Sequence, residues 1–358
     1  DNYTVLHLHT ELSSCTTNID SVTNYSDYIK RAKELGMKAI AITEHGNCFE
    51  WFKKKSCCEE NGIKYIHGAE FYVTETLDEK IKDNYHCCLY AKNYNGFLEL
   101  NKLISKSFNR EDNSFYYSPR ISLEDLFGTS NNIIITTACL GGFFGKGSDD
   151  LQSKVVSFMQ QNKDRCFLEI QPHLVEKQIK LNKKLYDIHK TTGIRLMVGT
   201  DTHALNDIHA KGRVILQKAK NIFFGDEEGW DLTFKTYEEL LNILKTQNAI
   251  PYEDYLKALE NTNIIADMVE EFKIDTSYKY PKLYEDSLSV LKQKVNQGII
   301  NRKINKYSDY KSEYIPRIYH ELETYIHNGA IDFLLLDEDI KTEMRDRGIY
   351  CGYSRGSC

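Results

Sequence analysis

The chain contains 358 residues, enough for roughly two or three domains, and 41% of them are hydrophobic. Its 46 basic and 52 acidic side chains leave a net charge of −6, which excludes a basic nucleic-acid coat but allows a local basic groove. No apolar run approaches the ~20 residues that span a membrane, and ten cysteines are too sparse for a disulfide scaffold, so we expect reduced thiols in a cytoplasmic protein.

Short β-rich runs alternate with amphipathic helical patterns through the first two hundred residues. One helical pattern covers residues 28–35 and ends at Gly36, and another covers residues 175–192. Because helices separate the strands, we predict βαβ units with a mainly parallel sheet, either open or closed as a barrel. The predicted strands are residues 4–8, 39–43, 64–66, 88–91, 133–137, 167–170 and 196–199.

Helical patterns dominate after about residue 210. Residues 234–272 read as wholly helical, and a polar stretch with Pro281 reads as a linker. Further helices are predicted at 290–304 and 314–327, and residues 332–351 read as a helix that leads into a short strand. We therefore predict a first domain of residues 1–225, a helical connector of residues 226–285 and a final segment of residues 286–358.

Metal-ligating residue types recur at the ends of the predicted strands. His7 and His9 are two residues apart, so a strand would point both imidazoles to one face, and Asp201 and His203 repeat this spacing. A lone buried histidine is usually a hydrogen-bonded core residue, and a lone acid after a strand is usually a helix cap. The recurrence favours a site at the mouth of a barrel. The other candidates at strand ends are His45, Glu70, His86 and Cys139.

This mixture of imidazole and carboxylate groups suits Zn²⁺, Mn²⁺ or Fe²⁺ better than Mg²⁺ alone. The candidates exceed the needs of one tetrahedral ion, so they indicate a cluster of two or three metals. Two neighbouring metals can activate a water molecule and stabilise the leaving oxygen of a phosphate ester. No serine–histidine–aspartate arrangement is evident, which favours hydrolysis by an activated water over covalent catalysis.

These motifs resemble the PHP (polymerase and histidinol phosphatase) superfamily, whose fold is a distorted seven-stranded β/α barrel with a trinuclear metal site. The resemblance lies in His7-Leu8-His9-Thr10, Thr43-Glu44-His45-Gly46, Gly68-Ala69-Glu70, His86, Cys139 and Asp201-Thr202-His203. Flanking segments resemble one branch, the α subunits of bacterial replicative DNA polymerase III (family C). These segments are residues 85–105, 136–142, 167–173 and 234–244.

The resemblance implies nine metal ligands, of which His9, His45, Asp201 and His203 would be catalytic. Asp20 is the ninth position, although more residues separate it from Ser13 than the family pattern has. Glu44 replaces the usual aspartate of the Thr-Asp-His motif. The implied ligands are His7, His9, Asp20, His45, Glu70, His86, Cys139, Asp201 and His203.

The last residues, 347–358, resemble the start of the palm of that polymerase family. Arg355, Gly356 and Ser357 match a Gly-Arg-Gly-Ser motif that contacts the triphosphate of the incoming nucleotide. The catalytic aspartates of the family lie later in its sequence. We therefore expect partners that include the remainder of the polymerase, in the same or a second polypeptide, a DNA primer-template and replisome subunits. Mg²⁺ would serve the complete polymerase, and no membrane is expected.

The resemblance implies a metal-dependent 3′–5′ proofreading exonuclease in the N-terminal part of such a polymerase. Two alternatives remain open, a stand-alone phosphatase acting on a small phosphomonoester such as histidinol phosphate, and a metal-bearing structural or docking module. Among the remaining histidines, His173 is a candidate for the cleft wall. The run Lys53-Lys54-Lys55 is predicted to be a solvated helix face.

Overall fold

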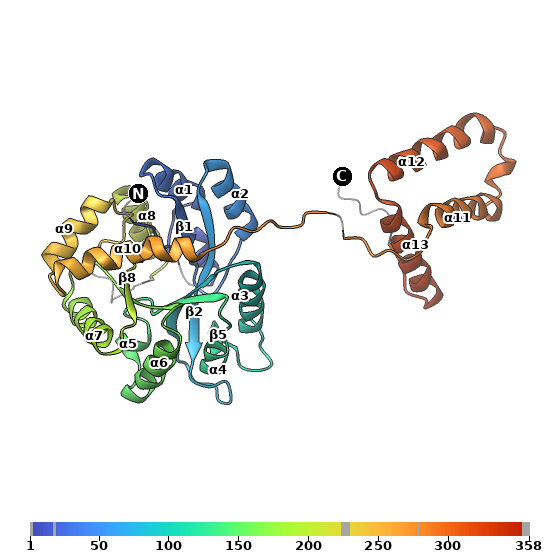
Figure 1. Ribbon diagram of the computed structural model, residues 1–358. Helices are drawn as coiled ribbons and strands as arrows, with labels where there is room; N and C mark the ends of the chain where they lie inside the picture. Colours follow the sequence, from blue (N-terminus) through green and yellow to red (C-terminus); the bar gives the residue numbers. More distant parts are fainter. Residues whose placement is uncertain (1–2, 17–18, 223–229, 278, 353–358) are drawn as a thin grey trace. The chain divides into compact units, whose positions relative to one another are not determined.

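The computed structural model describes residues 3–16, 19–222, 230–277 and 279–352. The chain forms two compact units, Asp1–Phe272 and Lys273–Cys358 (Figure 1). The first unit therefore extends beyond residue 225, because the following two helices share its core. No helix in the described ranges is long and apolar enough to cross a membrane.

A curled mixed sheet forms the centre of the first unit. Its strands follow the order β4-β5-β2-β3-β6-β7-β8, and β1 pairs with β2. Most neighbours are parallel, but β3 is antiparallel to both β2 and β6, and β4 is antiparallel to β5. The strands are β1 (Ala39–Ile42), β2 (Lys64–Thr74), β3 (Tyr85–Ala91), β4 (Phe115–Tyr116), β5 (Ser118–Ser122), β6 (Ile133–Thr136), β7 (Cys166–Ile170) and β8 (Arg195–Val198).

The N-terminal segment closes this sheet into a distorted barrel. Val5 forms a parallel bridge with Ile40 of β1, and Leu8 forms one with Thr202, which follows β8. The predicted strand at residues 4–8 is therefore present as isolated bridges on both sides rather than as a regular strand. This closure places His7 and His9 beside the segment that follows β8, where His9 N donates to Thr202 O at 2.8 Å.

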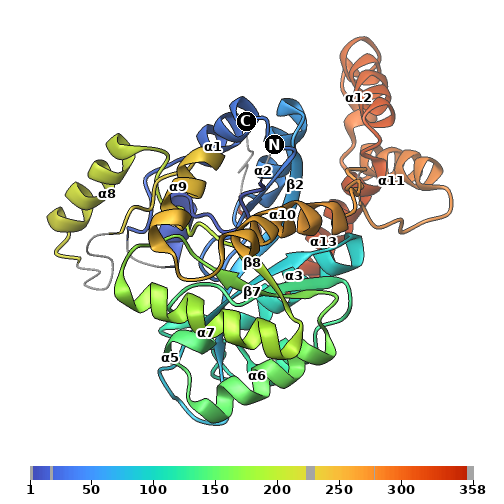
Figure 2. The same cartoon turned by 60° about the vertical axis from the view of Figure 1, so that its left-hand side comes forward.

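Helices surround the barrel in both views of the ribbon (Figures 1 and 2). Their starts follow ordinary capping chemistry; Thr236, for example, caps the following helix in a reciprocal capping box with Glu239. The helices of this unit are η1 (Glu11–Cys15), α1 (Tyr25–Glu34), α2 (Trp51–Asn61), α3 (Tyr94–Ser107), α4 (Leu123–Phe127), α5 (Phe143–Lys146), α6 (Asp149–Gln161), α7 (Glu176–Thr192), α8 (Asp207–Ala219), α9 (Tyr237–Gln247) and α10 (Tyr252–Met268).

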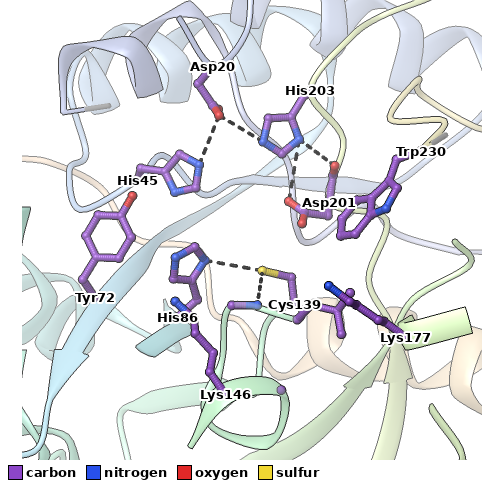
Figure 3. A pocket seen from close by; sticks show the side chains of 13 residues that line it. Asp20, His45, Tyr72, His86, Cys139, Lys146, Lys177, Asp201, His203 and Trp230 are labelled. Atoms are coloured by element: carbon purple, nitrogen blue, oxygen red, sulfur yellow. Dashed lines mark hydrogen bonds and ion pairs between the residues drawn. The ribbon is translucent and has the colours of Figure 1, made fainter. Parts of the chain in front are cut away.

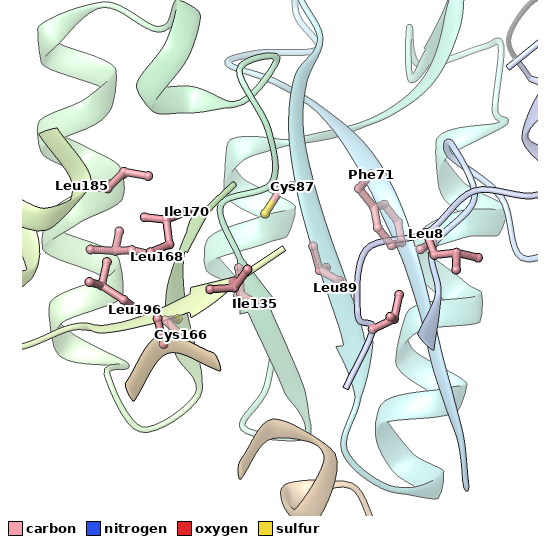
Figure 4. Packing of buried hydrophobic residues seen from close by; sticks show 14 of the residues in the cluster. Leu8, Phe71, Cys87, Leu89, Ile135, Cys166, Leu168, Ile170, Leu185 and Leu196 are labelled. Atoms are coloured by element: carbon pink, nitrogen blue, oxygen red, sulfur yellow. The ribbon is translucent and has the colours of Figure 1, made fainter. Parts of the chain in front are cut away.

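Alternating strand residues build two separate hydrophobic clusters. Outward residues such as Leu89 and Leu168 pack beneath the helices, where Leu185 of α7 joins them (Figure 4). Inward residues such as Tyr90 and Phe167 form a second cluster, which Ile265, Ala266 and Val269 of the α10 region complete. The two-residue period of a strand therefore separates the barrel interior from the layer under the helices.

In the part of the second unit that the structure describes, every regular element is a helix. The helix predicted at residues 332–351 is present as α13, but residues 347–352 contain no strand, so the prediction of a short strand there is wrong. Its elements are α11 (Ser287–Asn301), η2 (Ile304–Lys306), the π-helical turn η3 (Tyr310–Tyr314), α12 (Ile315–His327) and α13 (Ile331–Asp346).

Candidate metal centre

The inward rows of the strands lead from the hydrophobic interior to a polar site. In β2, Ile66 packs in the interior cluster and Glu70, four residues later on the same face, reaches the site. Met197 of β8 also packs in the interior cluster, and Asp201, three residues after the end of β8, reaches the same site. The interior therefore ends in a layer of ionisable side chains, as is typical of the mouth of a β/α barrel.

Glu70 lies at the centre of this layer and meets four histidines. Its Oε1 is 3.5 Å from His7 Nε2 and 2.9 Å from His86 Nδ1. Its Oε2 is 3.5 Å from His9 Nε2 and 2.7 Å from His45 Nδ1. Both carboxylate oxygens are thus shared between imidazole nitrogens, which is the arrangement of a bridging ligand.

Asp201 supplies a second carboxylate beside the first histidine pair. Its Oδ1 lies 3.2 Å from His7 Nε2 and 3.3 Å from His9 Nε2. The backbone of Asp201 has a φ of +46°, in the left-handed region that a residue with a side chain rarely adopts. Strain of this kind persists where the surrounding structure imposes it, which is common at functional sites.

Asp20 also joins the site despite its greater sequence distance from Ser13. Its Oδ1 lies 3.4 Å from His45 Nε2 and 3.3 Å from His203 Nε2 (Figure 3). The Arg213 guanidinium donates to the Asp20 carbonyl and helps to hold this loop against the barrel.

Cys139 follows β6 and completes the set. Its Sγ lies 3.4 Å from His86 Nδ1 and accepts from Gly141 N at 3.4 Å (Figure 3). Burial raises the pKa of this thiol well above its usual value. All nine residues implied by the sequence are therefore in one place, and we call them the candidate ligand cluster: His7, His9, Asp20, His45, Glu70, His86, Cys139, Asp201 and His203.

Subsets of the cluster can each converge on one ion. Side-chain atoms lie within 4.8 Å of one another in His9–Asp20–His45–His203, in His7–His9–Asp201 and in His45–Glu70–His86. Several buried atoms of the cluster make no hydrogen bond of regular geometry and face other ionisable atoms instead, as His45 Nδ1 faces Glu70 Oε2 at 2.7 Å. Such crowding of buried polar atoms is costly unless something else satisfies them. The atoms are His7 Nε2, His9 Nε2, Asp20 Oδ2, His45 Nδ1 and Glu70 Oε2. The residues present thus fit a polynuclear site for divalent metals.

The electrostatics differ between the histidines of the cluster. Burial by itself would lower the pKa of His45, but Asp20 and Glu70 raise it well above its ordinary value. Burial together with His45 and His203 lowers the pKa of His9 to about 4, so this imidazole is neutral and able to coordinate.

Glu169 of β7 is a functional candidate that the sequence interpretation missed. Its Oε1 lies 2.6 Å from His7 Nδ1, and Thr136 Oγ1 donates to its Oε2 at 2.7 Å. A Cβ at Gly199 would lie 1.9 Å from Oε1, so only glycine leaves room for this carboxylate. A carboxylate behind a ligating histidine fixes the ring and raises its basicity. The sequence could have indicated Glu169, because it lies two residues after Phe167 in β7 and so points to the same inward face of the strand.

Glu44 organises the opposite side of the cluster. It accepts hydrogen bonds from Thr10 N at 3.1 Å, Ser13 Oγ at 2.5 Å and Lys54 Nζ at 2.7 Å. Ser13 Oγ in turn lies 3.0 Å from His9 Nδ1, so this network orients an imidazole. Burial raises the pKa of Glu44, but the Lys54 ammonium and the hydrogen bonds from Ser13 and Thr10 together hold this pKa below its usual value. The expectation that Lys54 lies on a solvated face is wrong, because it is buried.

Two further predictions concern His173 at the cleft wall and the Arg355-Gly356-Ser357 segment. His173 is buried and stacks against Trp230, with ring centroids 4.6 Å apart, so it lies behind the pocket wall that Trp230 forms. Arg355, Gly356 and Ser357 lie outside the described residues, and their contact with nucleotide phosphates stays a prediction.

The cluster borders a pocket of about 540 Å³, which we call the site pocket. A β/α barrel with a layer of histidine and acidic side chains at one end of its strands defines a class of protein, the PHP domain. The family model of this domain matches residues 6–173. Residues 6–173 of the chain are thus a PHP domain, the family that the sequence motifs resemble.

Over almost its whole length the chain is also similar to DNA polymerase III subunit alpha. It is 29% identical over 375 residues to that subunit from Borreliella burgdorferi, covering 98% of this chain and 31% of the relative. It is 28% identical over 397 residues to the subunit from Helicobacter pylori, covering 99% of this chain and 32% of the relative. The chain therefore spans about a third of the length of these relatives.

A solved structure described as a metal-dependent phosphoesterase from Bifidobacterium adolescentis is similar to the chain, with a TM-score of 0.37 and 13% sequence identity. The matched region covers 60% of this chain and 96% of that protein.

Proposed function

We propose that this PHP domain is a 3′–5′ exonuclease that hydrolyses the terminal phosphodiester of DNA as part of a family C replicative polymerase. The observation that carries the proposal is the complete candidate ligand cluster, whose buried imidazole and carboxylate atoms converge in groups beside one pocket. The similarity to DNA polymerase III subunit alpha along 98% of the chain supports the polymerase context.

Hydrolysis joins a water oxygen to the terminal phosphorus and breaks the bond from that phosphorus to the 3′ oxygen of the preceding nucleotide. The released 3′ oxygen takes a proton, and the products are a nucleoside 5′-monophosphate and a strand one nucleotide shorter. The candidate ligand cluster would hold two or three divalent cations, Zn²⁺, Mn²⁺ or Fe²⁺, which when bound supply Lewis-acid activation of water and stabilise charge on the leaving oxygen.

The side chains of the protein contribute position and charge. Glu169 holds His7 from behind, and Ser13 with Glu44 holds His9, so two central imidazoles are fixed before substrate arrives. Lys146 and Lys177 also line the site pocket, where ammonium groups favour the approach of phosphate oxygens.

The polymerase context carries further parts of the proposal. Arg355, Gly356 and Ser357 would contact the phosphates of the incoming nucleotide, and Mg²⁺ would serve polymerisation once the rest of the polymerase is joined. DNA primer-template and replisome subunits would be the partners. Such a role places the chain in the cytoplasm, where its cysteines would stay reduced.

The test combines metal content with two substrates. The full chain is loaded with Mn²⁺ or Zn²⁺, its metal is quantified, and it is given a 3′-labelled mismatched primer-template in one reaction and p-nitrophenyl phosphate in another. We expect release of 3′ nucleotides that stops on addition of a chelator. Asp201→Ala and His203→Ala should lose bound metal and cleavage, whereas His320→Ala, at an exposed position in the second unit, should lose neither.

Each alternative function has its own result in this experiment. Turnover of the monoester alone would indicate a small-molecule phosphatase. Bound metal with no cleavage of either substrate would indicate a structural or docking module. Unchanged metal content and nuclease activity in the Asp201→Ala and His203→Ala variants would refute the assigned site.

A further inference from the structure

One part of the site pocket is not built by the candidate ligand cluster. Trp230, Tyr72, Lys146 and Lys177 also line this pocket, and Tyr72 lies beside His45, across the site from Trp230 (Figure 3). Lys146 is exposed at the end of α5, and Lys177 is exposed in the first turn of α7. An aromatic ring and two ammonium groups therefore border the same cavity as the candidate ligands.

Trp230 is held in a defined position. One face of its indole stacks on His173 with an interplanar angle of 19°, and the residue also lines the site pocket. His173 is itself buried, so this support is firm. Shortly after Trp230, Leu232 O accepts hydrogen bonds from His203 N at 2.9 Å and from Ala204 N at 3.1 Å. The backbone thus ties the indole to a residue of the candidate ligand cluster.

The chemistry of this wall matches a nucleotide. A fixed indole offers a stacking surface that every nucleobase can use, because every base has a π-face. Ammonium groups pair with backbone phosphates without regard to sequence. A base inside a duplex is stacked on both sides and could not use Trp230, whereas the base of an unpaired strand end is free to turn toward the indole.

We propose that this part of the site pocket holds the terminal nucleotide of a single DNA strand, with its base against Trp230 and the last phosphates of the strand near Lys146 and Lys177. The inference rests on the proposed exonuclease function and deepens it, because it names an unpaired strand end as the substrate. Trp230 is then a residue that selects the substrate, separate from the candidate metal ligands.

The two tryptophans of the chain make the binding step directly measurable. Trp51 packs against Phe97, with ring centroids 4.7 Å apart, and does not line the site pocket. A Trp51→Phe variant leaves Trp230 as the single tryptophan. The metal-loaded full chain with this substitution is titrated with a deoxythymidine dodecamer whose last linkage is a phosphorothioate. A second dodecamer ends in an abasic 3′ residue.

We expect saturable quenching of Trp230 fluorescence by the natural strand, and binding of the abasic strand that is weaker by roughly five- to a hundredfold, the scale of one base–aromatic stack. In the Trp51→Phe background, Trp230→Ala should weaken binding of the natural strand by the same factor and leave the abasic strand unchanged, measured by anisotropy of a 5′ label. Trp230→Phe should restore part of the affinity. Circular dichroism checks that each variant is folded.

The outcomes separate this inference from the proposed function. Equal affinity of the protein for the natural and the abasic strand would overturn the stacking site. An equal loss of affinity for both strands in Trp230→Ala and in Trp230→Phe would also overturn it. Either result would do so even if chelator-sensitive cleavage persists. Base-dependent quenching without any cleavage would support the stacking site and refute the exonuclease. A parallel test with Lys177→Met should weaken both strands alike, because a phosphate contact does not depend on the last base.

Discussion

In the barrel unit, side chains from strands and helices form continuous buried clusters, whereas the second unit is organised mostly by local interactions. The buried hydrophobic residues in the described part of the second unit are Leu291, Ile299 and Leu335. Helix α12 buries none of its residues. The barrel can therefore hold ionisable groups in a fixed, water-poor layer, while the second unit keeps its charges in solvent.

The ion pairs of the two units show the same difference. Lys54 and Glu44 in the barrel unit are almost fully buried, with side-chain exposures of 1% and 0%. In the second unit, Lys294 pairs with Asp339 at 2.7 Å while 35% of each side chain is exposed. Solvent screens the Lys294–Asp339 pair but not the buried Lys54–Glu44 pair. The same kind of ion pair therefore contributes differently to stability in the two units.

The largest expected effect comes from breaking the buried pair. Lys54→Met leaves the Glu44 carboxylate without its cation and should lower the free energy of unfolding by about 3–5 kcal/mol. Lys294→Met should cost about 0–1 kcal/mol. Urea denaturation followed by circular dichroism compares the two. Adding Glu44→Gln to Lys54→Met should recover part of the loss, and equal effects of the two lysine substitutions would contradict the comparison.

The next effect concerns the centre of the candidate ligand cluster. Glu70→Ala removes the carboxylate that meets His7, His9, His45 and His86 and should lower metal affinity and nuclease activity by more than about a hundredfold, beyond what loss of a supporting group costs. Atomic absorption and the primer-template assay measure both quantities. Glu321→Ala, an exposed glutamate that pairs with Arg317 in α12, is the matched control and should change neither.

A smaller effect is expected at Glu169, which contacts the candidate ligand His7 from behind. Glu169→Gln keeps the shape of the side chain but weakens its hold on His7 Nδ1, and it should lower metal affinity about 10–100-fold. Gly199→Ala should act in the same direction, because its Cβ would displace the same carboxylate. Titration with a competing chelator gives the affinities. Native affinity in both variants would show that Glu169 does not support His7.

The smallest effect is expected on the surface of the second unit. Ile326 in α12 is 48% exposed, so Ile326→Ser should change the free energy of unfolding by no more than about 0.5 kcal/mol. Leu240 in α9 is fully buried, and Leu240→Ala should cost about 2–5 kcal/mol. A large loss in Ile326→Ser would show that α12 buries this face in the full protein.

Much of the barrel could be predicted because its local patterns agree with its tertiary structure. The runs at residues 39–43, 133–137 and 167–170 match β1, β6 and β7 closely. The run at 64–66 extends to Thr74 in the structure, because β2 changes partners from β1 to β3 and β5 along its length. The antiparallel direction of β3 was also missed, since strand direction depends on how the chain returns to the sheet and not on residue pattern.

By itself the sequence determined the types and order of the candidate ligands, from His7 to His203, and their positions at strand ends. Only the tertiary structure decided that Asp20 reaches His45 and His203 across its longer loop. It also decided that Glu169 and Lys54, which look like ordinary strand and helix-surface residues, are buried beside the site. The reason is physical: residue spacing determines which side chains share a face of a strand, whereas burial and partner choice depend on segments far away along the chain.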